Sequence, residues 1–299
     1  MSGIVRAYVA GRPDGKGRQF DRIKLGRARL ASTDKAFLLT AGVEAGVLRL
    51  DETMRDVCSR AHARVPAAWL RRQVAKSDPS QSIIDAFASS RNLLAVCLWE
   101  LLPAAALARL DSLGFPSASP TVPSEALGTR TMSPLRITAA FASLANGGYF
   151  VRPFLTAARD TLAAGTRVWR ATTVAVMQQA MHRVIVSGTA RYAAEGMSGL
   201  DDIGLKTGTT EGNREFLVCG YRRSAREPLA ACMWVGYDRP RQIRSSGDAG
   251  TLLAPWFLKT MLARPASPSG VAPFTVATGA GQGPSGFVAS LASLTSVTH

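Results

Sequence analysis

A serine and a lysine three residues apart open the part of the chain that could do chemistry. Ser32 and Lys35 stand in the run Ser32-Thr33-Asp34-Lys35, directly before an apolar stretch over 36–43. On a helix, residues i and i+3 share a face, so the lysine can lie beside the serine hydroxyl. A serine becomes a strong nucleophile only when a base takes its proton, and a desolvated lysine can be that base. For the pair alone, a helix cap followed by a surface lysine is the commoner explanation.

Ser90 and Asn92 form a second candidate pair. They interrupt a helical apolar pattern that runs over 85–102. A break of this kind can project a hydroxyl and an amide into one site, where the hydroxyl relays a proton to a leaving amine and the amide holds a substrate carbonyl. For these residues alone, a polar boundary between two helices is the commoner explanation.

The third candidate is the run Lys206-Thr207-Gly208-Thr209 on a predicted strand. Side chains alternate along a strand, so Lys206 and Gly208 point to one face and the two threonines to the other. Because Gly208 has no side chain, an extended substrate could lie close along the strand. Lys206 would also supply a second cation that lowers the pKa of Lys35. For the tetrapeptide alone, a strand running into a turn is the commoner explanation.

The composition limits the class of protein. The chain has 299 residues, 46% hydrophobic and 19% charged, which suits one large or two small globular domains with a real core. Its 36 basic and 21 acidic residues give a net charge of +15. We find no dense arginine run, no aromatic interleaving and no nucleic-acid-binding motif, so we expect a scattered basic surface and no nucleic-acid partner.

The cysteines and histidines indicate neither a metal site nor a cofactor. None of the four cysteines (Cys58, Cys97, Cys219 and Cys232) lies in a C-x-x-C pair, and the three histidines are scattered. Cys219 and Cys232 fall on two candidate neighbouring strands, where a disulfide is possible, but we expect buried free thiols. No run of 18 apolar residues and no apolar signal core occur, so we expect no membrane segment and no export signal in this chain.

Hydrophobic periodicity predicts the elements that position the candidate residues. Predicted helices cover 32–46, much of 47–120, 134–145, the region around 174–184, and 249–262. Predicted strands cover 4–10, 203–208, 215–222 and 228–237, and the last three should pair antiparallel because short turns connect them. These elements indicate an α+β fold, an antiparallel sheet flanked by helices with an inserted all-helical lobe.

Taken together, the three motifs and their flanks resemble the transpeptidase domain of class A (bifunctional) penicillin-binding proteins, in the β-lactamase/transpeptidase-like superfamily. The resemblance covers about residues 3–262. The segments that carry it are 26–37 around Ser32, the helix-and-turn signature over 132–153, Ser187-Gly188-Thr189-Ala190, 206–210, and Trp234-Val235-Gly236-Tyr237-Asp238.

The resemblance implies a serine D,D-transpeptidase that cross-links peptidoglycan stem peptides through an acyl-Ser32 intermediate. Lys35 would act as general base, while Ser90 and Lys206 would assist proton transfer to the departing D-Ala. β-Lactams would acylate Ser32 as inhibitors. The implied location is the periplasm or cell envelope. The implied site comprises the catalytic residues Ser32, Lys35, Ser90 and Lys206 and the substrate contacts Asn92, Thr207, Gly208 and Thr209.

Further roles follow from the same resemblance. Asn92 would position the peptide, and Thr207 and Thr209 would bind its terminal carboxylate. The backbone N–H groups of Ser32 and Thr209 would form the oxyanion hole. The implied partners are peptidoglycan stem peptides and β-lactams.

Some segments depart from the family pattern. Leu30-Ala31 replaces the usual Pro-Gly, Ala36 replaces a proline, and Glu215-Phe216-Leu217 stands where Asp-Ala-Trp-Phe is usual. The chain also begins after the family's first strand, which pairs with the 3–5 segment, so we expect an unpaired strand and reduced stability. The expected division is a domain over 1–262, with its helical lobe over about 47–200, and a low-complexity, loosely ordered tail over 263–299.

Two alternatives stand beside the transpeptidase. The early start and the altered flanks favour a truncated, catalytically weak or inactive penicillin-binding remnant. A β-lactamase-type serine hydrolase would need an acid that activates water for deacylation, and Glu125 is the only nearby candidate.

Overall fold

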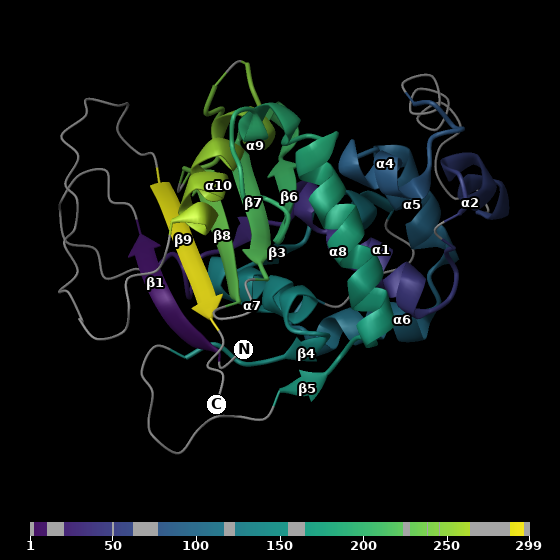
Figure 1. Ribbon diagram of the computed structural model, residues 1–299, viewed down its shortest axis with the longest axis horizontal. Coiled ribbons are helices and arrows are strands. Elements are labelled where there is room, and N and C mark those ends of the chain that lie inside the picture. The colour runs from purple at the N-terminus through teal and green to yellow at the C-terminus, as the bar shows by residue number, and fades with distance from the viewer. Residues whose placement is uncertain are drawn as a thin grey trace.

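The computed structural model places a five-stranded antiparallel sheet beside a helical lobe (Figure 1). It describes residues 3–10, 21–49, 51–61, 77–116, 123–154, 165–223, 228–237, 239–244, 246–263 and 288–295. The sheet order is β1-β9-β8-β7-β6. The strands are β1 (Ile4–Ala10), β6 (Ile203–Thr209), β7 (Glu215–Arg222), β8 (Leu229–Gly236) and β9 (Val288–Thr295). Two short ladders join β2 (Ala28–Arg29) to β3 (Thr131–Met132) and β4 (Tyr149–Phe150) to β5 (Thr166–Arg167).

The predicted strands after residue 200 and their antiparallel pairing are confirmed. β6 pairs with β7 from Ile203↔Arg222 to Thr209↔Phe216, and β7 pairs with β8 along its whole length. The two faces of this sheet meet different helices. Tyr221 stands over Gly204, beside Met181 of the long helix α8 (Ala171–Val186), whereas Arg222 donates to the Met261 carbonyl of α10 (Ala254–Leu262).

A strand forms where the sequence indicated only an irregular tail. β9 pairs with β8 along all eight of its residues and with β1 at six positions. The expectation of a loosely ordered tail is therefore wrong for 288–295, and β1 does not lack a neighbour in the sheet. The segment Val-Ala-Ser-Leu-Ala-Ser-Leu-Thr has few strongly strand-forming residues, so its conformation depends on pairing at both edges.

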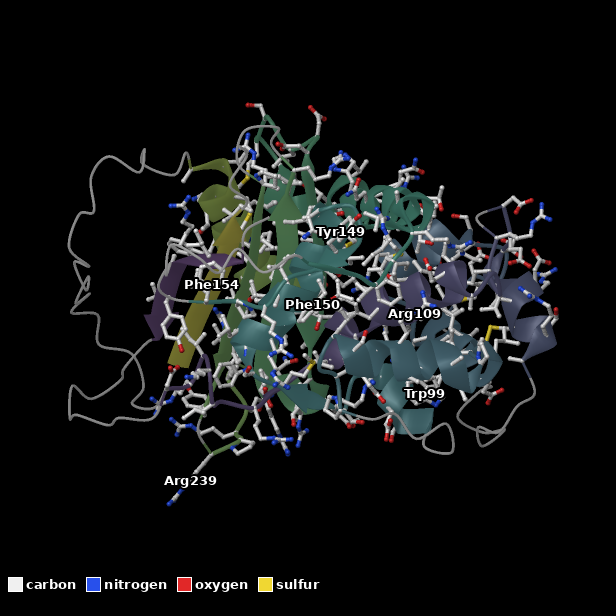
Figure 2. All side chains as sticks on the ribbon, turned by 90° about the horizontal axis from the view of Figure 1, so that it is seen from below. Trp99, Arg109, Tyr149, Phe150, Phe154 and Arg239 are labelled. Atoms are coloured by element: carbon white, nitrogen blue, oxygen red, sulfur yellow. A yellow bond between two sulfur atoms is a disulfide. The ribbon has the colours of Figure 1, made fainter. Side chains whose placement is uncertain are left out.

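The outer edge of β1 is partly covered by the chain around Phe154. The Val5 N–H donates to the Phe154 carbonyl (2.9 Å), and the Phe154 N–H donates to the Gly3 carbonyl (3.0 Å). Figure 2 shows Phe154 beside this strand. The first residues of β1 therefore have backbone partners on both sides.

Within the described residues the predicted helices form, with breaks at the polar and proline positions, while 62–76 of the predicted helical region lies outside those residues. Ser82 and Ser133 cap their helices by accepting a hydrogen bond from the N–H three residues ahead. The predicted closing helix is divided in two before Pro255, which occupies the first turn of α10. The helices are α1 (Lys35–Glu44), α2 (Met54–Arg60), α4 (Ile83–Ala88), α5 (Asn92–Leu101), α6 (Ala104–Ser112), α7 (Pro134–Ala145), α8, α9 (Ala249–Leu252) and α10, with 3-10 turns η1 (Ala31–Thr33), η2 (Pro123–Leu127), η3 (Arg191–Ala194) and η4 (Glu211–Asn213).

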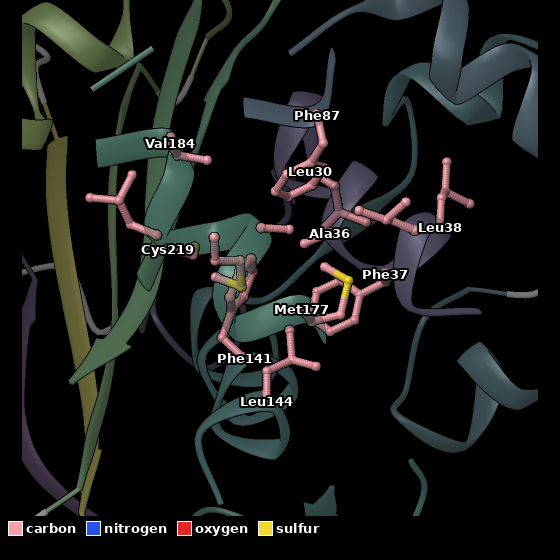
Figure 3. Packing of buried hydrophobic residues seen from close by; sticks show 14 of the residues in the cluster. Leu30, Ala36, Phe37, Leu38, Phe87, Phe141, Leu144, Met177, Val184 and Cys219 are labelled. Carbon is pink, nitrogen blue, oxygen red and sulfur yellow. The ribbon is translucent and has the colours of Figure 1, made fainter. Parts of the chain in front are cut away.

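Helix α1 runs through the middle of the core, and its residues from Lys35 to Gly42 are all buried. Phe37 stacks edge-on against Phe141 of α7 (5.0 Å between ring centroids) and against Phe115 (4.7 Å). Figure 3 shows Phe37, Phe141 and Met177 of α8 in the same buried cluster. Because neighbours enclose α1, the start of this helix is fixed by packing on every side.

Two disulfides replace the expected free thiols. Cys219 on β7 bonds to Cys232, its register partner on β8, and Cys58 on α2 bonds to Cys97 on α5. The expectation of free cysteines is therefore wrong. Sequence spacing alone could not show either bond, because each depends on two elements coming into contact.

Within the described ranges, no single helix is long and apolar enough to cross a membrane. Helices α5 and α6 satisfy that test only when they are taken together, and they are bent by 108° with respect to each other.

Candidate active site

The Ser32 turn is held against a neighbouring backbone segment. The Leu30 N–H donates to the Arg130 carbonyl (3.0 Å), and the Ala31 N–H donates to the Gly128 carbonyl (2.8 Å). Gly128 adopts φ +75°, and a Cβ there would lie 1.9 Å from the Ala31 oxygen. Only glycine permits the two backbones to approach this closely.

Lys35, one turn along from Ser32, is buried and hydrogen bonded. Its Nζ donates to the Ser90 carbonyl (2.6 Å) and to Asn92 Oδ1 (2.7 Å), and it lies 3.4 Å from Ser90 Oγ. Burial lowers the pKa of Lys35 well below its ordinary value, and the Lys206 cation lowers it further. A lysine in this setting loses its proton far more readily than a surface lysine does.

Ser90 and Asn92 reach Lys35 because the chain reverses between α4 and α5. Ser90 adopts φ +57°, a left-handed conformation that is uncommon outside glycine. The Ser90 N–H donates to the Phe87 carbonyl (2.9 Å), which closes the end of α4, and Asn92 begins α5. The polar break in the apolar pattern is therefore the turn that aims both side chains at one lysine.

Lys206 brings the third motif to the same serine. Its Nζ donates to Ser90 Oγ (2.9 Å) and to the Thr207 carbonyl (3.0 Å), and its side chain has no exposed surface. Burial lowers the pKa of Lys206 to about 7, against the opposing influence of the Asp248 carboxylate. Two buried amines thus meet at the Ser90 hydroxyl.

Strand β6 lies directly against the turn that carries Ser32. A Cβ on Gly208 would lie 3.0 Å from Thr33 Cγ2 and 3.1 Å from the Leu30 oxygen. The missing side chain at Gly208 therefore makes room for the Ser32 turn. Ser32 itself is half-buried, and its hydroxyl makes no hydrogen bond to the part of the chain that the structure describes.

The two threonines of the third motif have intramolecular partners. The Thr207 and Thr189 hydroxyls lie 2.7 Å apart, and Thr209 Oγ1 accepts from the Ala249 N–H at the start of α9 (3.0 Å). Thr189 belongs to the run 187–190, one of the segments that carry the family resemblance. The fold therefore brings that run into contact with the third motif.

Two buried carboxylates were missed as supports of the site. Glu215 Oε2 accepts from the Arg29 N–H and from Trp234 Nε1, both at 3.0 Å, and so connects β2, β7 and β8. Asp34 forms a buried salt bridge with Arg130 (Nη2–Oδ1 2.8 Å). The sequence offers little signal for either role, because Asp34 lies inside the first motif beside Lys35 and Glu215 directly follows Arg214.

This arrangement is suited to moving a proton between two amines and one hydroxyl. Ser90 accepts from Lys206 and lies within 3.4 Å of Lys35, so it can relay a proton between them. Among the residues that the structure covers, no group of three or more His, Cys, Asp or Glu side chains is placed to hold a metal ion.

The antiparallel sheet beside a helical lobe, with helix α1 enclosed in the core, is the architecture of a transpeptidase fold. A family model described as "Penicillin binding protein transpeptidase domain" matches residues 22–237. The chain therefore belongs to the penicillin-binding protein transpeptidase family. The predicted α+β fold is confirmed by a crystal structure of penicillin-binding protein 1A from Haemophilus influenzae, which superposes with a TM-score of 0.61 at 18% identity, over 86% of this chain and 45% of that one.

Curated relatives extend well beyond this chain. Penicillin-binding protein 1A of Neisseria cinerea is 28% identical over 283 residues, 87% of this chain and 34% of that protein. Penicillin-binding protein 2D of Bacillus subtilis is 27% identical over 270 residues, 82% of this chain and 37% of that protein. The chain thus spans about a third of the length of the curated relatives that it matches.

Proposed function

We propose that this chain is a serine D,D-transpeptidase that cross-links peptidoglycan stem peptides through an acyl-Ser32 intermediate. The observation that carries the proposal is the buried contact of Lys35 and Lys206 with one hydroxyl, that of Ser90. Each of the three sequence motifs contributes at least one residue to this network. A cap, a helix boundary and a strand end, the commoner explanations for the separate motifs, would not bring these groups together.

The acylation step uses Lys35 as the base. Neutral Lys35 takes the proton of Ser32 as Oγ attacks the carbonyl of the penultimate D-Ala, and a tetrahedral oxyanion forms. The N–H groups of Ser32 and Thr209 stabilise that charge. The C–N bond then breaks, and the leaving D-Ala amine receives a proton through Ser90 from Lys35 or Lys206.

The second half of the reaction reverses these transfers. An amine from another stem peptide gives up a proton through the same relay and attacks the acyl carbonyl. The bond to Ser32 Oγ breaks, the serine is protonated again, and the cross-link remains. Asn92 holds the stem peptide, and Thr207 and Thr209 bind its terminal carboxylate, exchanging their internal hydrogen bonds for the ligand.

The two disulfides support an extracytoplasmic setting for this chemistry. Disulfides persist in oxidising compartments and are rare in the reducing cytosol. Cys58–Cys97 and Cys219–Cys232 therefore suit a protein of the periplasm or cell envelope, where peptidoglycan is the substrate and β-lactams arrive as inhibitors.

Intact-protein mass spectrometry after incubation with benzylpenicillin tests the proposal. The parent should gain the mass of one penicilloyl group, and Ser32→Ala should gain none. A second pair of variants distinguishes loss of the proton relay from loss of the folded structure. Ser90→Ala should acylate at least 100-fold more slowly, as loss of a proton-transfer group predicts, whereas Ser89→Ala, whose hydroxyl accepts from Gln81 instead, should match the parent.

The outcome also decides between the alternatives. A persistent adduct together with D-Ala release from a pentapeptide donor would support the transpeptidase. An adduct that hydrolyses rapidly would support a β-lactamase-type hydrolase. A folded parent that forms no adduct would support the inactive remnant.

A further inference from the structure

The residue before Ser32 has an unusual backbone conformation. Ala31 adopts φ +46°, and only Ser90 and Asn213 share this left-handed region among the non-glycine residues that the structure describes. Alanine pays a steric penalty there that glycine does not. Such strain persists only where the surroundings hold it, and it concentrates at functional sites.

Arg130 contacts both ends of the strained turn. Its carbonyl accepts from the Leu30 N–H before the turn, and its guanidinium binds Asp34 after it. The contact with Asp34 is fork-like, with Nη2 at 2.8 Å from Oδ1 and 2.9 Å from Oδ2, and Nε at 3.2 Å from Oδ2. One residue thus spans the five positions from Leu30 to Asp34, with Ser32 at their centre.

The guanidinium is itself fixed in place. It lies 5.2 Å from the Phe115 ring centroid and 5.6 Å from that of Trp99, and Nη1 donates to the Pro116 carbonyl (3.4 Å). The side chains of Arg130 and Asp34 are 4% and 0% exposed. An Arg fork with both oxygens of a carboxylate fixes orientation as well as distance.

We infer that Arg130 and Asp34 form a positioning pair that holds Ala31 in its left-handed conformation and so aims Ser32 at its substrate. A buried ion pair is a poor source of stability, because desolvation offsets the attraction and an apolar pair of similar volume serves as well or better. Because the contact is bidentate, it fixes the relative orientation of the two side chains, which an apolar contact does not. The inference rests on the proposed acylation of Ser32 and deepens it.

The first test separates positioning from stability. The double variant Asp34→Leu/Arg130→Met fills the same space without charge and should unfold within a few degrees of the parent. We expect its second-order rate constant for benzylpenicillin acylation to fall 10- to 100-fold, with the same loss of rate at every pH between 6 and 9. Arg130→Lys keeps the cation but loses the fork, and it should show the same loss; it decides the question if the double variant does not fold.

The second test asks whether the pair acts through residue 31. Glycine accepts φ +46° without penalty, so adding Ala31→Gly to either pair variant should recover most of the lost rate. Ala36→Gly, the same exchange in the first turn of α1, should recover none. A pair variant that folds and acylates at the parental rate would overturn the inference, as would a loss that Ala31→Gly leaves unchanged.

A double-mutant cycle on thermal stability tests the Arg130–Asp34 positioning pair without measuring acylation. In the parent, Ala31→Gly removes strain and should raise the thermal midpoint, whereas in Arg130→Lys residue 31 has relaxed and the rise should disappear. If Ala31→Gly and Arg130→Lys shift the thermal midpoint additively, the two residues are not coupled and the inference is overturned. If the parent fails to acylate while the cycle shows coupling, the proposed function fails, but the positioning pair is still supported.

Discussion

The two edges of the central sheet are built in different ways. The β6 edge carries the candidate site, and it consists of three consecutive strands, each paired with the next along the chain. The opposite side consists of β1 and β9, so that the two ends of the chain meet at Ile4↔Thr295. Consecutive strands pair at little loop-closure cost, whereas joining distant segments costs more conformational entropy before any contact is gained.

The β6 edge supplies residues of the candidate active site, whereas the β1–β9 side supplies contacts that hold the sheet together. The β6 edge presents Lys206 to Ser90 and places Gly208 against the Ser32 turn. β9 lies on the other side of β7 and β8 from β6, and it is the strand that connects β1 to the rest of the sheet. We therefore expect damage at β9 to affect stability first, and damage at β6 to affect acylation first.

Removing β9 should have the largest effect. Deletion of 288–299 exposes the backbone groups of β8 and β1 that now pair with β9, and should cost more than about 4 kcal/mol of unfolding free energy. Urea denaturation measures the loss. Deletion of 296–299 alone is the control and should leave the midpoint unchanged. If both deletions unfold at the parental midpoint, β9 has no such role.

Loss of the sheet disulfide should have the next largest effect. Cys219→Ala/Cys232→Ala opens a bond that joins β7 to β8 between cysteines 13 positions apart, and should cost about 3 kcal/mol through the gain in unfolded-chain entropy. The thermal midpoint with and without reductant measures it. Cys58→Ala/Cys97→Ala leaves the sheet intact but opens a longer loop, between cysteines 39 positions apart, and by the same argument should lower the midpoint at least as much. An unchanged midpoint in the sheet variant would refute the expectation.

Lys206→Met should damage chemistry more than stability. We expect acylation by benzylpenicillin to fall about 100-fold, the usual loss when a proton-transfer group is removed. Because the Lys206 cation helps to lower the pKa of Lys35, its removal should also move the rising limb of the pH–rate profile to higher pH. Lys259→Met, an exposed lysine on α10, is the matched control. A profile that stays in place would exclude coupling between the two amines.

The smallest effect is a dependence of stability on pH. The folded chain gives up the Lys206 proton near pH 7, whereas the unfolded chain keeps it up to the ordinary pKa of 10.5. The unfolded state binds more protons inside this window, so the unfolding free energy should rise with pH there. Urea midpoints from pH 6 to 9 measure the rise, which should be shallower in Lys206→Met; equal slopes would contradict the assignment.

Much of the fold could be predicted from local patterns. The change of period over 203–237, with polar turns between short apolar segments, predicted three antiparallel strands, and the helical spacing over 134–145 predicted α7. Ser90 and Asn92 were identified as a polar break inside an apolar helix, and that break is a left-handed turn. Short-range periodicity carries these features because each depends on residues only a few positions apart.

The sequence by itself determined the three motifs, their order, the elements that bear them and the family to which the chain belongs. Only the tertiary structure decided that 288–295 forms a strand between β8 and β1, that both cysteine pairs are bonded, and that Arg130 reaches Asp34. Each of these features depends on contact between segments that come together only on folding. The segment 288–295 has only a weak local preference for a strand, and nothing next to Asp34 in the sequence predicts its partner. In both cases the structure depends on the partner that the fold brings into contact.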